Sequence, residues 1–136
     1  MKIYLSLLCS LLFLFSCEQD TPKLLNEVDG RWKLVKIGFG FPPPNSPTDY
    51  TPDYVEIIDF NASKQRFTRT KDGKVVEDTK VNVGMQGILQ TIVFEESKMY
   101  STVSFTENPY RLVLDQSSPV GSVLADGNRF FYEKVK

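Results

Sequence analysis

From residue 31 onward, apolar and polar side chains alternate in short runs that turn residues separate. Runs of this kind are typical of β-strands with two faces. The alternation is imperfect, since Ile88, Ile92 and Phe94 share one face while Leu89 and Val93 lie on the other. Eight strands are predicted, at residues 31–37, 54–60, 65–70, 74–83, 88–95, 99–105, 110–115 and 129–135.

Most of the predicted strands are joined by tight turns, of which Lys71-Asp72-Gly73 has the strongest hairpin signal. Short connections favour antiparallel neighbours, because parallel pairing needs crossovers of about a dozen residues or more. Eight strands in one open sheet would leave two edges, which closure removes. We therefore predict an all-β fold, an eight-stranded antiparallel up-and-down barrel. The long connection 116–127 leaves an immunoglobulin-like sandwich as the alternative.

A short helix is predicted ahead of the first strand. Thr21 is placed as its N-cap and Pro22 at its first helical position. The helix is expected to end at Asp29-Gly30. One or two turns cannot stand alone in water, so we expect this helix to dock on the barrel. Its apolar residues share one face: Leu24, Leu25 and Val28.

The chain begins with Met1-Lys2 and an apolar run over residues 3–16, followed by polar residues from Glu18. A membrane-spanning helix needs about 20 residues, which is longer than this run. The pattern is instead that of a cleaved secretory signal. Its last residues, Leu14-Phe15-Ser16-Cys17, resemble the lipobox of bacterial lipoproteins, although Phe15 is bulkier than usual at its position.

The lipobox resemblance implies that Cys17 receives a diacylglycerol and becomes the first residue of the mature chain. Residues 1–16 are then the signal peptide, 17–23 the acylated cysteine with a tether, and 24–136 the domain. Palmitate and related acyl chains would hold the protein in the bacterial cell envelope, and we expect the outer membrane, with its periplasmic or outer face left open. An ordinary cleaved signal with an incidental cysteine is the alternative.

Gly30-Arg31-Trp32, at the start of the first strand, resembles the Gly-x-Trp signature of lipocalins and the wider calycin group. The resemblance implies that Trp32 closes one end of the barrel and that a basic residue of the last strand packs across it. Lys134 or Arg129 can do so here. Lysine departs from the family's arginine, because it retains only a cation–π contact with the indole.

The break around Pro42-Pro43-Pro44 is the longest irregular stretch. In the lipocalin arrangement this connection folds over the open end of the barrel, which implies that its aromatic residues line or cover a pocket mouth. The alternative is that they cap the core and that the prolines block edge pairing. The candidate ligand-binding residues are Phe39, Phe41, Tyr50 and Tyr54.

The composition excludes several kinds of chemistry. The chain has no histidine, which excludes a histidine base, a Ser-His-Asp triad and a histidine-ligated metal. Without residues 1–16 the 16 basic residues become 15 against 17 acidic ones, a balance that gives no indication of nucleic acid. Adjacent carboxylates such as Glu77-Asp78 point to opposite faces of a strand. We expect no catalysis, no cofactor and no metal site.

Two functions remain open, and in both the protein is lipid-anchored. In the first, the barrel binds a small hydrophobic molecule, as the lipocalin resemblance implies. In the second, side chains fill the barrel, which acts as a protein–protein interaction or structural subunit of an envelope assembly. Thirteen phenylalanine and tyrosine residues follow the signal, enough to fill an eight-stranded barrel. The sequence does not identify a ligand or an oligomeric state.

Overall fold

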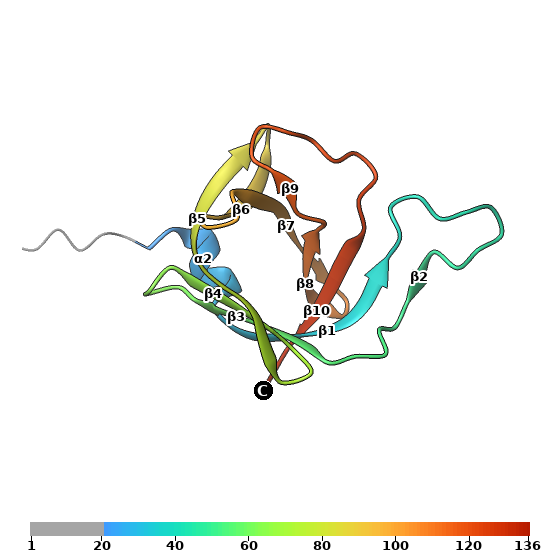
Figure 1. Ribbon diagram of the computed structural model, residues 1–136, viewed down its shortest axis with the longest axis horizontal. Coiled ribbons are helices and arrows are strands. Elements are labelled where there is room, and N and C mark those ends of the chain that lie inside the picture. Colours follow the sequence, from blue (N-terminus) through green and yellow to red (C-terminus); the bar gives the residue numbers. More distant parts are fainter. Residues whose placement is uncertain (1–20) are drawn as a thin grey trace, which may run out of the picture.

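The computed structural model describes residues 21–136, which form one short helix, α2 (Lys23–Val28), followed by strands (Figure 1). Runs that alternate apolar and polar residues become strands, as the pattern predicts. The strands are β1 (Gly30–Gly38), β2 (Asp49–Tyr50), β3 (Glu56–Asn61), β4 (Arg66–Lys71), β5 (Lys74–Gln86), β6 (Leu89–Phe94), β7 (Met99–Glu107), β8 (Tyr110–Asp115), β9 (Ser118–Pro119) and β10 (Arg129–Lys134).

Eight of these strands close into an antiparallel barrel. The closing pair is β1 with β10, in which Trp32 lies opposite Lys134 and Ile37 opposite Phe130. Each remaining strand pairs with its neighbours around the ring, in the order β1, β3, β4, β5, β6, β7, β8 and β10. The prediction of an eight-stranded antiparallel barrel with a short N-terminal helix is confirmed, and the sandwich alternative is wrong because the sheet closes on itself.

The two shortest strands extend the barrel wall. β9 pairs with the start of β7, while β2 pairs with the end of β1, where Tyr50 lies opposite Ile37. Residues 39–52, here called the arm, therefore continue outward from β1 and extend away from the barrel (Figure 1). The expectation that residues 39–52 fold over the open end of the barrel is wrong, because the pairing of β2 with β1 directs the arm away from that end.

Aromatic side chains fill the centre of the barrel. Phe60, Phe67 and Phe94 come from β3, β4 and β6, and each is at most 1% exposed. The ring centroids of Phe60 and Phe67 lie 4.9 Å apart, and those of Phe67 and Phe94 lie 5.0 Å apart. Trp32 and Tyr132 are equally buried. These contacts leave the middle of the barrel packed with side chains.

α2 covers one end of the barrel with its apolar face, as expected, since Leu24, Leu25 and Val28 are all buried. The predicted capping is wrong. The helix begins at Lys23, Pro22 is the N-cap, and no side chain caps the helix. After the helix, Asp29 Oδ1 accepts a 2.7 Å hydrogen bond from the amide of Ala62, which ties this end of α2 to the β3–β4 turn.

Because the strands alternate in direction, each turn can be assigned to one end of the barrel. The helix end carries α2, the β3–β4, β5–β6 and β7–β8 turns, and the C-terminal end of β10. The arm end carries the arm, the β4–β5 and β6–β7 turns, and the connection from β8 to β10. The observed strand bounds differ from the predicted ones by a few residues. For example, β3 begins at Glu56 and not at residue 54, because the backbone of Val55 makes hydrogen bonds with Asp72 in the β4–β5 turn.

Candidate functional site

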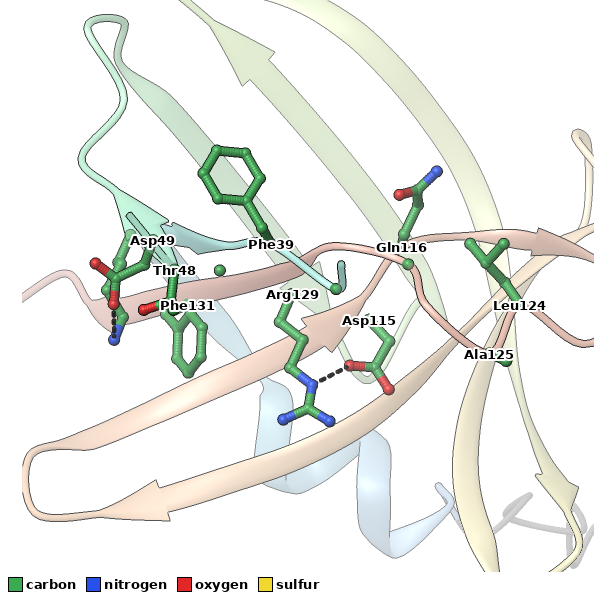
Figure 2. A pocket seen from close by; sticks show the side chains of 13 residues that line it. Phe39, Thr48, Asp49, Asp115, Gln116, Leu124, Ala125, Arg129 and Phe131 are labelled. Atoms are coloured by element: carbon green, nitrogen blue, oxygen red, sulfur yellow. Dashed lines mark ion pairs between the residues drawn. The ribbon is translucent and has the colours of Figure 1, made fainter. Parts of the chain in front are cut away.

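A groove lies outside the barrel wall, between the arm and the connection that leads into β10 (Figure 2). Its volume is about 370 Å³. Phe39 of the arm, Leu124 of the connection and Phe131 of β10 supply its large apolar side chains. The groove belongs to the arm end of the molecule. It is open to the surface and does not enter the barrel interior.

Two ion pairs border this groove (Figure 2). Lys36 Nζ lies 3.1 Å from Asp49 Oδ2 and 4.5 Å from the centre of the Phe131 ring. Arg129 Nε lies 3.5 Å from Asp115 Oδ1. All four charged side chains are at least one-third exposed, so these pairs contribute little to stability. Balanced charges beside apolar walls suit a ligand that has both apolar and charged groups, such as a polypeptide segment.

The arm is fastened against the connection at Gly40. A β-carbon placed there would lie 2.1 Å from the carbonyl oxygen of Asp126 and 2.3 Å from that of Gly127. Glycine therefore permits a backbone approach that no other residue allows. The amide of Phe39 donates a 2.9 Å hydrogen bond to the Thr48 carbonyl, which closes the arm on itself. These contacts hold the two walls of the groove together.

A second hollow, of about 230 Å³, lies at the arm end within the barrel. Glu56, Arg69 and Tyr132 line it from β3, β4 and β10. The Tyr132 hydroxyl donates a 2.8 Å hydrogen bond to Glu56 Oε1. Arg69 Nε lies 3.9 Å from the same oxygen, is buried and makes no hydrogen bond. The hollow therefore has a polar wall, which matches a small polar molecule better than an apolar one.

The phenol of Tyr132 is held in its neutral form. Burial first, and then the negative charge of Glu56, raise the pKa of Tyr132 well above its ordinary value of 10.0. Tyr54 is affected in the same sense, because burial and the charge of Glu56 raise the pKa of its phenol. Neutral Tyr132 keeps the proton that it donates to Glu56, so the hydrogen bond persists over the ordinary pH range.

The four aromatic residues predicted to form a pocket mouth do not gather in one place. Phe39 lines the groove and stacks on Tyr50, with ring centroids 5.2 Å apart. Phe41 is 82% exposed. Tyr54 packs against the core and lies under Lys71, whose Nζ is 3.6 Å from the ring centroid. The structure thus places one of the four on the groove wall and the other three outside the residues that line it.

Trp32 and Lys134, the candidate closing residues, are brought together. Trp32 is fully buried, and its Nε1 donates a 2.7 Å hydrogen bond to the Val28 carbonyl. Lys134 Nζ lies 5.2 Å from the centre of the Trp32 ring. Arg129, the other basic residue considered, lies at the opposite end of β10 and pairs with Asp115 instead.

Cys17, the predicted lipidation site, lies outside the described residues. Among residues 21–136, no cluster of three or more acidic, histidine or cysteine side chains has the spacing to hold a metal ion. Within the same range, no helix has the length and hydrophobicity needed to cross a membrane.

Sequence reasoning missed the polar group inside the barrel. Glu56 has the same strand parity as Ile58 and Phe60, and Arg69 has the same parity as Phe67, so alternation alone would have placed both side chains inside the barrel.

No family model matches the chain, and comparisons with curated proteins and with solved structures find no match either.

Proposed function

We propose that the protein is a lipid-anchored envelope lipoprotein whose lipocalin-like barrel serves as an interaction module and performs no catalysis. Acyl chains on Cys17 would attach it to the membrane, since two or three chains give lasting attachment where one does not. In this proposal the barrel is a rigid scaffold. Its binding surface is the groove between the arm and the connection, because binding residues gather on loops that a scaffold holds in place.

The observation that carries this proposal is the filled interior. Phe60, Phe67 and Phe94 contact one another across the barrel, and Trp32 and Tyr132 are at most 1% exposed. An apolar molecule bound at the centre of the barrel would have to displace these side chains. The groove needs no such change, because its apolar walls and its two ion pairs are already open to the surface.

A second candidate function is binding of a small polar molecule within the barrel. The polar hollow of about 230 Å³ favours it, since Arg69 Nε is buried there without a hydrogen-bond partner. Unpaired buried donors are costly, and a bound acceptor would satisfy this one. The apolar cargo that the lipocalin resemblance implies has less support, because the hollow is lined by Glu56 and by the Tyr132 hydroxyl.

The interaction proposal is tested by photocrosslinking in intact cells. A benzoylphenylalanine placed at Phe41 or Leu124 should give discrete protein adducts. The same residue at Val76, which is 58% exposed on β5, is the matched control and should give none. Native mass spectrometry of the purified protein should show no bound small molecule. A stoichiometric apolar ligand, together with absence of adducts at the arm, would overturn the interaction module in favour of a carrier.

Anchoring is tested separately. Radiolabelled palmitate should label the wild-type chain and not the Cys17→Ala variant. Equal labelling of the two would remove Cys17 as the attachment site. This result would leave the filled barrel and its groove untouched, so the two parts of the proposal can fail independently.

A further inference from the structure

The β5–β6 hairpin is uncharged over an unusual length. Residues 81–94 contain no acidic or basic residue, and the nearest charged residues along the chain are Lys80 and Glu95. The tip of this hairpin is nevertheless exposed. Met85 is 62% exposed, Ile88 92% and Leu89 53%. Contiguous patches of exposed apolar side chains mark surfaces that contact a protein, a ligand or a membrane.

The tip carries apolar side chains on both of its faces. Met85 has the strand parity of Val81, which points into the barrel, and Leu89 has the parity of Val93 on the outer face. Met85 lies beyond the barrel core and therefore remains exposed. An apolar hollow of about 290 Å³ continues from Met85 toward Val120 and Val123 of the connection. A ribbon with an exposed apolar side chain on each face suits insertion into an apolar medium better than docking by one face.

By strand direction the hairpin tip belongs to the helix end of the barrel, the end that α2 covers. Five residues, 18–22, separate Cys17 from the start of α2 at Lys23. Even a fully extended chain of this length spans only about 20 Å. If Cys17 is anchored in a bilayer, the helix end must therefore face that bilayer closely.

We propose that the tip of the β5–β6 hairpin, residues 85–89, inserts its apolar side chains into the surface of the bilayer that holds the acyl chains. This inference rests on the anchoring part of the proposed function. It gives the anchored barrel a second membrane contact and a fixed orientation, with the arm and its groove directed away from the lipid.

Among the turns at the helix end, the β5–β6 turn is the one whose side chains favour entry into lipid. The β3–β4 turn contains Lys64, and Glu107 ends β7 beside the β7–β8 turn; both charges would have to be removed from water to enter an apolar phase. The β5–β6 tip carries only glutamine, glycine and apolar side chains, so its insertion costs no charge desolvation. Its backbone groups are paired with each other in the hairpin ladder up to Gln86 and Leu89.

The test uses the full acylated chain reconstituted into vesicles of phosphatidylethanolamine and phosphatidylglycerol. An Ile88→Cys variant is labelled with the environment-sensitive fluorophore NBD. Val75→Cys is the matched control, because Val75 is 62% exposed at the opposite end of the same strand. The wild-type chain, whose Cys17 thiol is acylated, measures background labelling. We expect blue-shifted emission and protection from aqueous dithionite at position 88, and neither at position 75.

The possible failures are distinguishable. If the chain floats with the vesicles and position 88 reports water, the tip does not insert, whereas anchoring through Cys17 stands. If the chain does not float with the vesicles, anchoring fails and the inference fails with it. Without vesicles, the fluorophore at position 88 could become protected from dithionite as the protein concentration rises. This result would indicate a second copy or another protein on this surface, and it would overturn the lipid contact.

Discussion

The hydroxyl of Tyr132 donates a buried 2.8 Å hydrogen bond to Oε1 of Glu56, although 76 residues separate the two side chains. Tyr132 is on β10 and Glu56 on β3, and both strands pair with β1, one on each side. The bond therefore joins the last strand to an early one across the closing strand. It links closure of the barrel to the polar hollow at the arm end.

Replacing Tyr132 by phenylalanine should destabilise the barrel without changing its shape. Glu56 is only 8% exposed and would lose the donor that satisfies it. Leaving a buried acceptor unpaired costs about 1–3 kcal/mol. Urea denaturation followed by circular dichroism measures the loss. The matched control is Tyr100→Phe, since Tyr100 donates an exposed bond to the Ser122 carbonyl and its removal should cost about 1 kcal/mol or less. Equal losses in the two variants would contradict the special role of the buried bond.

The free energy of unfolding should decrease at high pH because of Tyr132. The raised pKa of Tyr132 means that the folded protein keeps the phenolic proton at pH values where the unfolded chain, with its pKa near 10.0, has released it. Between pH 8 and about pH 10 this side chain should leave the free energy of unfolding unchanged, and above pH 10 the free energy of unfolding should decrease until the raised pKa is passed. Urea denaturation between pH 8 and pH 11 measures this slope.

The Tyr132→Phe variant is the control for the pH dependence, and its slope above pH 10 should be shallower than that of the wild type. A smaller slope should remain, because the pKa of Tyr54 is also raised. Identical slopes in the two proteins would show that Tyr132 does not carry the alkaline loss.

Much of the fold could be predicted from the sequence, because strand alternation and tight turns are local signals. The Lys71-Asp72-Gly73 turn and the inward faces of β3 and β4 follow from these signals. The course of the arm could not be predicted. It depends on the pairing of Tyr50 with Ile37 and on the approach of Gly40 to Asp126, and both contacts join residues that no local pattern relates. The groove exists only through these contacts, so it was missed.

Replacing Gly40 by alanine should separate the arm from the connection. The added methyl group would lie 2.1 Å from the Asp126 carbonyl oxygen, so one of the two backbones must move. We expect faster amide hydrogen exchange in the arm and in residues 124–128, with unchanged exchange in the barrel strands. Phe41→Ala is the matched control, because Phe41 is adjacent in the chain and 82% exposed. Unchanged exchange in Gly40→Ala would mean that this contact does not hold the groove together.

Loss of adducts at Leu124 in a Gly40→Ala background would connect the contact to binding. In the interaction proposal both walls of the groove must be in place, so crosslinking should decrease although the barrel remains folded. Adducts that persist unchanged would indicate that the partner contacts the connection alone.

Removing an aromatic ring from the barrel centre should convert a filled interior into a binding cavity. Phe67 is fully buried between Phe60 and Phe94, so Phe67→Ala deletes the central ring of three. Such a change costs about 3–5 kcal/mol and leaves an apolar void. Voids of this kind stay dry and take up small apolar molecules such as benzene. Benzene should therefore raise the melting temperature of Phe67→Ala and leave that of the wild type unchanged.

This comparison decides between the interaction module and an apolar carrier, because it asks whether the aromatic centre of the native barrel has room for a guest. Phe67→Leu, with a smaller void, keeps the test open if the alanine variant does not fold, and Val76→Ala at an exposed position measures any general effect of benzene. Stabilisation of the variants alone is the result that a filled barrel requires. Stabilisation of the wild type would mean that the native barrel already takes up an apolar guest, and the carrier function would then take precedence over the interaction module.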